Sequence, residues 1–343
     1  MTQTPVTVLT GYLGAGKTTL LNRILSEEHG KKYAVIVNEF GEIGIDNDLV
    51  VGADEEVFEM NNGCVCCTVR GDLIRVVQGL MKRKAGFDGI VIETTGLADP
   101  GPVAQTFFVD EEVRSKAKLD SVTTVVDAKH ILLRLSDSRE AAEQIAFADQ
   151  IVLNKTDLVD ESDLKLIEAR IRRLNPLAPI HRAQRSNVPL DAILGRGGFD
   201  LDRILELEPE FLNPAHGEPG HVHDEDCDDH DHHGHDHHHH DHVHDDDIKG
   251  VSLRMDKPLD PQKVTQWLND LLAVRGPDIL RAKGILNVKG EERRLVFQAV
   301  HMILEGDYQR PWREGEDRSS RMVFIGRNLD EALLRVGFNT CAA

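Results

Sequence analysis

Residues 11–18 read GYLGAGKT and match the pattern G-x-x-x-x-G-K-[ST], whose residue types suit phosphate binding. The glycines let the loop wrap with its backbone N–H groups facing inward, where they contact the α- and β-phosphates of a nucleotide. Lys17 would reach the β- and γ-phosphates, and Thr18 offers its hydroxyl to Mg²⁺. The apolar run 6–10 predicts a strand before the loop, and residues 19–25 predict an amphipathic helix after it. The residues predicted to hold the phosphates are Gly11, Gly14, Ala15, Gly16, Lys17, Thr18 and Thr19.

The segment 154–157, which reads NKTD after the apolar strand 150–153, indicates which base is bound. Guanine presents two N–H donors on one edge, and the carboxylate of Asp157 can accept both. Adenine presents an acceptor there, and mispairing a buried polar group costs enough to discriminate between the two bases. We therefore predict GTP, with Asn154 steadying the loops and the stem of Lys155 covering the base.

Glu93 ends the apolar strand 89–92, and Gly96 follows three residues later. A carboxylate and a glycine at this spacing are typical of the loop with which a GTPase senses the γ-phosphate and Mg²⁺. The usual acid is Asp, and many GTPases place a water-orienting Gln directly after the glycine, where this chain has Leu97. Slow intrinsic hydrolysis is therefore expected, with the missing group supplied by a partner, a metal or another loop. The predicted catalytic residues are Lys17, Thr18 and Glu93.

Three of the five cysteines, Cys64, Cys66 and Cys67, fall within four residues. A turn precedes them and a helical apolar stripe follows, so the thiols would lie at a helix N-terminus, where thiolates are favoured. Soft thiolates suit zinc and other thiophilic metals. A redox pair or buried structural thiols remains the alternative. A disulfide framework is disfavoured because Cys227 and Cys341 are isolated and five is an odd number.

Three sulfur ligands do not complete the tetrahedron of a zinc site. The segment 38–42, which reads NEFGE after the strand 33–37, offers Glu39 and Glu42 and occupies the position of a nucleotide-sensing switch loop. We predict that these carboxylates and the thiols share one Zn²⁺, or a Co²⁺ or Ni²⁺ in its place.

Residues 216–247 contain thirteen of the seventeen histidines, twelve Asp or Glu, and neither Lys nor Arg. Such a segment cannot bury apolar surface, so we predict that it is disordered. Neutral imidazoles are good ligands for Zn, Ni, Co and Cu, which favours metal capture over a plain solvated linker. The predicted ligands are His230, His232, His233, His235, His237, His238, His239, His240 and His242.

The net charge of −19 argues against nucleic acid as a partner. The sequence shows neither a signal peptide nor a run of eighteen apolar residues, and free thiols fit a reducing compartment. A cytoplasmic protein that contacts no membrane is therefore expected.

Strands near 6–10, 33–38, 89–93, 121–127, 150–154 and 179–182 alternate with helices. This order predicts an α/β fold, a mostly parallel doubly wound sheet of the P-loop NTPase type. A smaller α+β domain follows, with strands near 249–255, 280–289, 294–302 and 321–326 and helices near 261–273 and 329–336. The predicted boundaries are 1–210 for the GTPase domain, 211–247 for the metal-binding linker and 248–343 for the C-terminal domain, which we expect to be a client or homo-oligomer surface. The last guanine-side loop is expected near residues 181–183.

The motifs GYLGAGKTT, NEFGE, GCVCC, ETTGLADP and NKTD together resemble those of the CobW-type metallochaperone GTPases, relatives of the nickel-accessory GTPases of urease and hydrogenase. Residues 280–284 and 321–326 are similar to parts of that family's C-terminal domain. The resemblance implies that the thiol motif binds Zn²⁺ or a similar ion, that GTP controls its transfer, and that the client is a metalloprotein.

Two other functions compete with a GTPase metallochaperone. A metal buffer would act mainly through the histidines and would show no coupling between Zn²⁺ and GTP hydrolysis. An ATP-dependent kinase would require the segment 154–157 to be accidental, and ATP would then compete against GTP.

Overall fold

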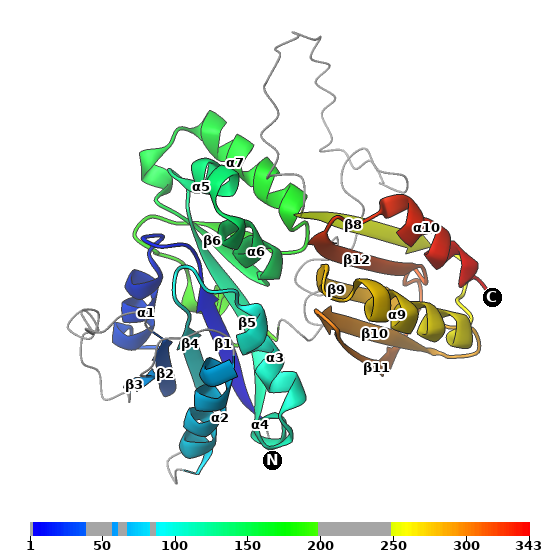
Figure 1. The fold of residues 1–343 in the computed structure, drawn as a ribbon, viewed down its shortest axis with the longest axis horizontal. Helices are drawn as coiled ribbons and strands as arrows, with labels where there is room; N and C mark the ends of the chain where they lie inside the picture. Colours follow the sequence, from blue (N-terminus) through cyan, green and yellow to red (C-terminus); the bar gives the residue numbers. More distant parts are fainter. Residues whose placement is uncertain (1–2, 39–56, 61–66, 83–86, 198–247) are drawn as a thin grey trace.

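The computed structural model describes residues 3–38, 57–60, 67–82, 87–197 and 248–343 of the 343-residue chain (Figure 1). It contains a seven-stranded sheet in the N-terminal part and a five-stranded sheet in the C-terminal part.

The first sheet has the strand order β3-β2-β4-β1-β5-β6-β7, and all of its neighbouring strands are parallel. Its strands are β1 (Thr4–Thr10), β2 (Tyr33–Asn38), β3 (Val57–Met60), β4 (Gly89–Glu93), β5 (Ala117–Asp127), β6 (Gln150–Asn154) and β7 (Ile180–Arg182). The predicted parallel sheet is confirmed. The sequence pattern missed β3, because four residues are too few to show a periodicity. Since β4, β1, β5 and β6 lie side by side, the loops that follow them meet at one edge of the sheet.

Helices cover both faces of this sheet. They are α1 (Lys17–Ser26), α2 (Cys67–Met81), α3 (Gly101–Val109), α4 (Glu111–Lys116), α5 (Ile131–Asp137), α6 (Arg139–Phe147) and α7 (Glu161–Leu174), with short 3-10 helices η2 (Thr156–Leu158) and η3 (Leu190–Ala192). Leu9 and Val125 pack on the face that α1 covers, whereas Val8 and Val126 pack against the remaining helices. This period-2 alternation gives the doubly wound arrangement that the sequence predicts.

The second sheet is antiparallel throughout, with the order β11-β10-β9-β12-β8. Its elements are β8 (Ile248–Met255), α9 (Pro261–Arg275), β9 (Ile279–Leu286), β10 (Arg293–Val300), β11 (Ile303–Pro311), β12 (Ser320–Arg327) and α10 (Glu331–Thr340). The predicted α+β character is confirmed. The prediction missed β11, because this edge strand is half-exposed and carries no regular apolar alternation.

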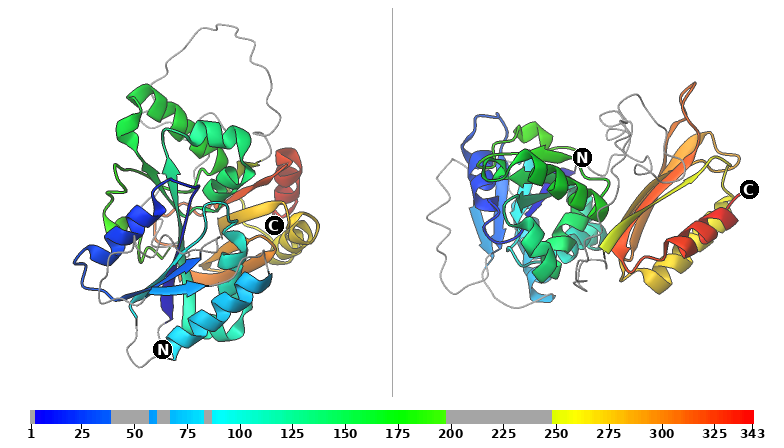
Figure 2. Two further views of the ribbon diagram at one scale, coloured as in Figure 1. Left: turned by 60° about the vertical axis from the view of Figure 1, so that its left-hand side comes forward. Right: turned by 90° about the horizontal axis from the view of Figure 1, so that it is seen from above.

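One face of the second sheet packs against α9 and α10, and the opposite face turns toward α3, α6 and α7 of the first domain (Figure 2). Asp149, between α6 and β6, accepts bonds from Arg281 (Nη2, 2.6 Å) and Lys283 (Nζ, 2.7 Å) of β9. All three side chains are at most 4% exposed. The two domains therefore share a buried ionic contact as well as apolar packing.

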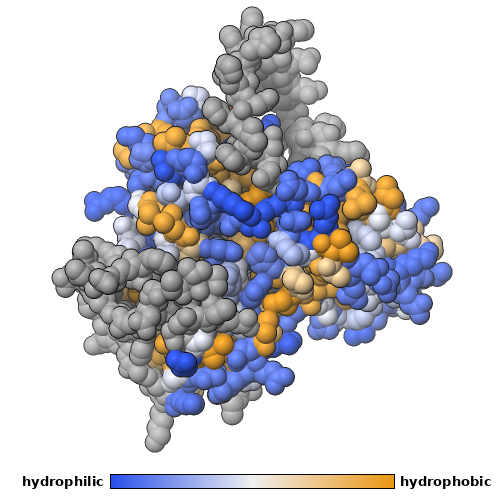
Figure 3. Space-filling view, viewed as in Figure 1, coloured by the Kyte–Doolittle hydropathy of each residue, from blue (hydrophilic) through white to orange (hydrophobic). Residues whose placement is uncertain are grey.

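No helix in the part of the chain that the structure describes combines the length and the apolar run needed to cross a bilayer. On the face drawn in Figure 3, hydrophilic residues dominate and hydrophobic ones form small separate groups. Two exposed apolar side chains, Leu13 and Leu97, lie on loops at the carboxyl edge of the first sheet, at 59% and 54% exposure.

Candidate nucleotide site

The glycine-rich loop between β1 and α1 has the backbone that a phosphate-binding loop requires. Gly11 and Gly16 have φ angles of 138° and 111°, which side-chain-bearing residues rarely adopt. A Cβ on Gly11 would lie 2.2 Å from the carbonyl oxygen of Val125, and one on Gly16 would lie 2.4 Å from Nδ2 of Asn154. The helix α1 then begins at Lys17, so its N-terminus faces the loop.

Lys17 is 8% exposed and folds back over its own loop. Its Nζ donates to the carbonyl oxygens of Gly11 at 2.9 Å and Tyr12 at 3.3 Å. The ammonium group therefore stands inside the loop, where phosphate oxygens would replace the two carbonyls.

Thr18 and Glu93, predicted from two separate motifs, lie together. The hydroxyl of Thr18 donates to Oε1 of Glu93 at 3.3 Å, and Glu93 is 6% exposed. These are hard oxygen donors of the kind that Mg²⁺ prefers, so the pair fits a nucleotide-bound Mg²⁺.

Gly96, three residues after Glu93, packs directly on the phosphate loop. A Cβ on Gly96 would lie 2.7 Å from the backbone nitrogen of Leu13 and 2.6 Å from its side chain. The loop after β4 is therefore in contact with the loop after β1, as sensing of a γ-phosphate requires.

The residues predicted to hold the base also brace the phosphate loop. Asn154 Nδ2 donates to the carbonyl oxygen of Ala15 at 2.8 Å, and Lys155 Nζ donates to that of Gly14 at 2.8 Å. Lys155 has a left-handed backbone, with φ of 61°. Asp157, in η2, presents an exposed side chain.

Two further residues of this site carry no spacing signature in the sequence. Asp127, at the end of β5, accepts from Lys155 Nζ at 2.6 Å. Ser186 donates its backbone N–H to Asn154 Oδ1 at 2.7 Å and its hydroxyl to the carbonyl oxygen of Gly16 at 3.0 Å. Both lie far from their partners in sequence, so only the folded sheet reveals their part in the site.

Asp127 is held as a carboxylate. Burial alone would raise its pKa, but the hydrogen bonds from Lys155 and His130 outweigh burial and lower it. The negative charge therefore stays in place to orient the Lys155 side chain.

At the position expected for the guanine-side loop, near residues 181–183, the carbonyl oxygen of Ala183 accepts the N–H of Thr156 at 3.1 Å and its hydroxyl at 3.0 Å. His181 belongs to β7 and its Nε2 is 2.8 Å from Oε1 of Gln150, whereas Ser186 reaches Asn154. The strand continues through Arg182, and the loop follows it.

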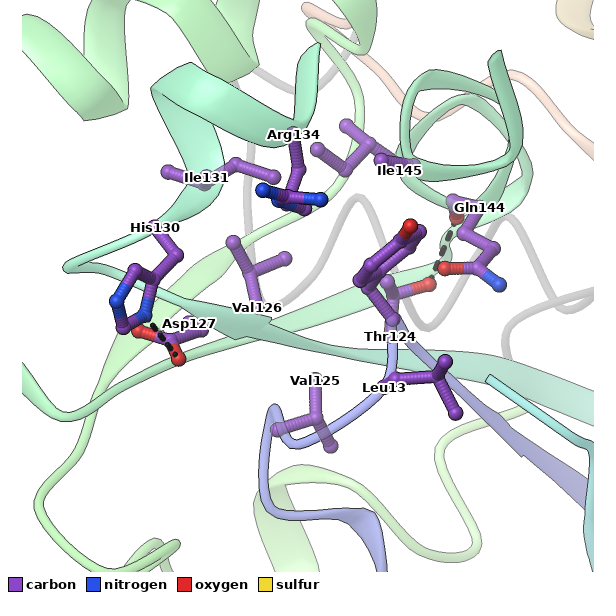
Figure 4. Close-up of a pocket in the computed structure, with 12 residues that line it drawn as sticks. Leu13, Thr124, Val125, Val126, Asp127, His130, Ile131, Arg134, Gln144 and Ile145 are labelled. Carbon is purple, nitrogen blue, oxygen red and sulfur yellow. Dashed lines mark hydrogen bonds and ion pairs between the residues drawn. The ribbon is translucent and has the colours of Figure 1, made fainter. Parts of the chain in front are cut away.

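A cavity of about 270 Å³ lies behind the phosphate loop, between Tyr12, the end of β5, α5 and α6 (Figure 4). The guanidinium of Arg134 stands 5.6 Å from the centre of the Tyr12 ring. His130 Nδ1 lies 2.9 Å from Asp127 Oδ2, and Gln144 lines the cavity from α6. The volume is small for a nucleotide, since ligand pockets typically enclose about 300–1,000 Å³.

Most of the predicted metal ligands, namely Glu39, Glu42, Cys64, Cys66 and the histidines within 230–242, lie outside the described residues. Cys67 is the first residue of α2, so the predicted helix start at the thiol motif is confirmed. The described residues contain no group of three His, Cys, Asp or Glu side chains that could hold a metal ion. Cys341, after α10, is a fully buried free thiol whose sulfur lies 3.4 Å from the carbonyl oxygen of Gly337.

Two family models match the chain. The nucleotide-binding domain of the CobW/HypB/UreG family covers residues 5–182, and the cobalamin synthesis protein CobW C-terminal domain covers residues 248–342. The chain is 36% identical to the zinc chaperone YjiA of Escherichia coli (strain K12) over 338 residues, which cover 97% of each chain. It is also 36% identical to the zinc chaperone CobW of Pseudomonas aeruginosa over 372 residues, covering 99% of this chain and 92% of that one. Among solved structures it is similar to the Zn(II)-bound YjiA GTPase from E. coli, with 33% identity, a TM-score of 0.74 and full coverage of both chains.

Proposed function

Because the chain belongs to the CobW/HypB/UreG family, we propose that it is a GTPase that delivers Zn²⁺, or a similar transition metal, to a client metalloprotein. The observation that carries this proposal is the contact between the base-binding segment and the phosphate loop. Asn154 and Lys155 both donate to backbone carbonyls of that loop, so one rigid unit serves base and phosphates together.

The chain selects guanine through Asp157, whose exposed carboxylate is available to the two N–H donors of the base. Lys155 is held in its left-handed conformation by Asp127 and Gly14, which leaves its stem free to cover the ring. A left-handed backbone costs free energy at a residue other than glycine, and such residues cluster at functional sites.

For hydrolysis, Lys17 neutralises the β- and γ-phosphates, and Thr18 and Glu93 hold Mg²⁺. When bound, Mg²⁺ supplies further neutralisation of the charge on the transferred group. The loop after Glu93 contacts the phosphate loop at Gly96, so it is placed to respond to the γ-phosphate. The residue after that glycine is Leu97, which cannot orient water, and the intrinsic rate is therefore slow.

Zn²⁺ is the cargo in this proposal. Cys64, Cys66 and Cys67 bind it, and Glu39 and Glu42 link it to the nucleotide. The zinc chaperones among the relatives support zinc over Co²⁺ or Ni²⁺. The linker 211–247 collects metal near the GTPase domain, and the C-terminal domain provides the surface for the client or for a second copy.

Single-turnover GTP hydrolysis with and without Zn²⁺ tests the proposal. In a metallochaperone of this kind, bound Zn²⁺ changes the hydrolysis rate or the GTP affinity. If GTP changes the affinity for Zn²⁺, then Zn²⁺ must change the affinity for GTP by the same factor. Competition by ATP against labelled GTP is the control for base selection, and the Cys64→Ser/Cys66→Ser/Cys67→Ser protein is the control for the metal. A hydrolysis rate and a GTP affinity that are both identical with and without Zn²⁺ would contradict nucleotide-controlled delivery.

One observation favours a second candidate, a metal buffer. Thirteen histidines within 216–247 would bind several ions without any need for GTP. In that case deletion of this segment would abolish most metal binding and leave no zinc-dependent change in GTP hydrolysis.

A further inference from the structure

Residues 94–100, the Glu93 loop, join Glu93 at the end of β4 to the start of α3. The first residue of the loop is tied to β1, because Thr94 donates its N–H to the carbonyl oxygen of Leu9 at 2.9 Å and its hydroxyl to Thr10 Oγ1 at 2.9 Å. The rest of the loop depends on α6 and on the C-terminal domain.

Gln144 of α6 holds the middle of the Glu93 loop. Its side chain is buried, and Nε2 donates to the carbonyl oxygens of Gly96 at 3.1 Å and Ala98 at 3.2 Å. The reverse orientation of the amide would place its oxygen against both carbonyls, so the orientation is fixed. No described residue donates a hydrogen bond to Oε1, which lies on the side of Gln144 that faces the cavity of Figure 4. The amide thus leaves one buried acceptor unpaired while both of its bonds serve the loop.

The preceding residue of α6 faces the C-terminal domain. Glu143 is 6% exposed and accepts from Arg327 Nη2, at the end of β12, and from Arg139 Nε at 2.7 Å. One turn of α6 therefore contacts the Glu93 loop through Gln144 and the second sheet through Glu143.

The first residue of α3, directly after the Glu93 loop, lies against the C-terminal domain. Asp99 Oδ1 accepts the N–H of Gly101 at 2.8 Å, which fixes the entry into α3. A Cβ on Gly101 would lie 2.7 Å from Nε2 of His301 and 3.0 Å from the ring of Phe147. His301 occupies the turn between β10 and β11, and its ring centre is 5.1 Å from that of Phe147. Close packing of this kind transmits a displacement of one part to the other.

We infer that Gln144 is a positioning residue for GTP hydrolysis, and that the C-terminal domain supports the same loop, through Arg327 bound to Glu143 of α6 and through His301 packed at the start of α3. The inference rests on the proposed GTPase function. Gln144 acts through the loop, because its two bonds set where Gly96 lies against the phosphate loop. The C-terminal domain is then part of the machinery that sets the hydrolysis rate, in addition to any surface that it offers to a client.

The test uses the full chain with Gln144→Met, which keeps the shape and removes both bonds, and with Arg327→Gln. Arg318→Gln is the matched control, because among the described residues the Arg318 side chain pairs only with Glu292, and both side chains are exposed. Gln144→Met is expected to lower kcat about tenfold, the effect of losing two ordinary hydrogen bonds, while GDP affinity stays within about twofold. Arg327→Gln lowers kcat in the same sense, and Arg318→Gln does not.

Hydrogen exchange of the peptide that covers residues 94–101 is measured on the same proteins without nucleotide. The inference requires faster exchange there in Gln144→Met and Arg327→Gln than in the wild type and Arg318→Gln. Unchanged exchange, or a fall in GDP affinity that parallels the fall in kcat, would overturn it. A wild type that hydrolyses no GTP would defeat the proposed function, while the exchange result would still decide whether these residues support the loop.

Discussion

Replacing Asp149 with asparagine is expected to destabilise the protein more than any surface substitution would. Its Oδ1 accepts from Arg281 at 2.6 Å and from Lys283 at 2.7 Å, and its Oδ2 accepts from the N–H of Val122 at 2.9 Å. Burial alone would raise the pKa of Asp149, but the two cations outweigh burial and lower it. The carboxylate is therefore charged at neutral pH and compensates two buried positive groups of the other domain.

The magnitude follows from what remains after the substitution. Asparagine keeps the shape but not the charge, so Arg281 and Lys283 stay buried and lose the charge of the carboxylate that both contact. Removing one partner of a buried ion pair typically costs about 3–5 kcal/mol. Replacing all three residues together, as Asp149→Leu, Arg281→Met and Lys283→Met, removes every charge and is expected to cost far less than the single substitution.

Urea unfolding followed by tryptophan fluorescence and by circular dichroism measures this effect. Both tryptophans, Trp267 and Trp312, lie in the C-terminal domain, so fluorescence reports that domain while circular dichroism reports the whole chain. A carboxylate whose pKa is lowered by folding stabilises the protein at pH values above its unfolded pKa of about 3.9. That stabilisation is lost as the pH falls through the pKa of the folded state. The difference between Asp149→Asn and wild type is thus expected at pH 7 and shrinks below about pH 4. A difference under about 1 kcal/mol at pH 7 would refute the assignment of a compensating charge.

Four other predictions concern binding. Lys17→Ala is expected to abolish GTP binding, because backbone amides alone do not match the charge of the β- and γ-phosphates; near-normal affinity by isothermal titration would refute the phosphate-loop assignment. Asp157→Asn is expected to weaken GTP binding by roughly 1.5–3 kcal/mol, as for a hydrogen bond to a charged group, and equal ATP and GTP affinities of the wild type would contradict guanine selection. Zn²⁺ affinity is expected to differ by about 1–3 kcal/mol between the GDP and GTP-analogue forms, and identical values would exclude coupling. Deleting residues 216–247 is expected to spare GTP hydrolysis and remove most bound metal. In the full-length protein, the metal bound by this segment should dissociate as the pH falls from about 7.5 to 5.5, since imidazole has a pKa near 6.5. If the full-length and deleted proteins bind equal numbers of metal ions at about pH 7.5, the segment is only a linker.

The sequence predicted the elements whose residues work at fixed spacing. The phosphate loop, Glu93 and Asn154 each follow an apolar strand, and their motifs state both the residue types and the local geometry. Parallel strands end at a common edge, so the meeting of Thr18 with Glu93 and of Asn154 with Ala15 could be expected.

The contacts that sequence reasoning missed join residues far apart in the chain. Asp127 binds a lysine 28 positions later, and Gln144 binds a glycine 48 positions earlier. Neither residue stands in a motif, and a lone Asp or Gln on a strand end or a helix carries no distinguishing pattern. Strand β11 was missed for a different reason, since an edge strand need not bury one face and loses the alternation that marks a strand.

The burial of Cys341 has a practical consequence for thiol chemistry. Burial raises the pKa of this thiol, and the reactive species toward alkylating reagents is the thiolate, so Cys341 should remain unmodified while the C-terminal domain is folded. Four of the five cysteines then account for any colour in a native thiol titration, namely Cys64, Cys66, Cys67 and Cys227. The number of cysteines that added Zn²⁺ protects from the reagent could then be measured without a contribution from Cys341 and without mutating the chain. Denaturation would expose Cys341 to the reagent, and the additional thiol per chain would give an internal check of protein concentration.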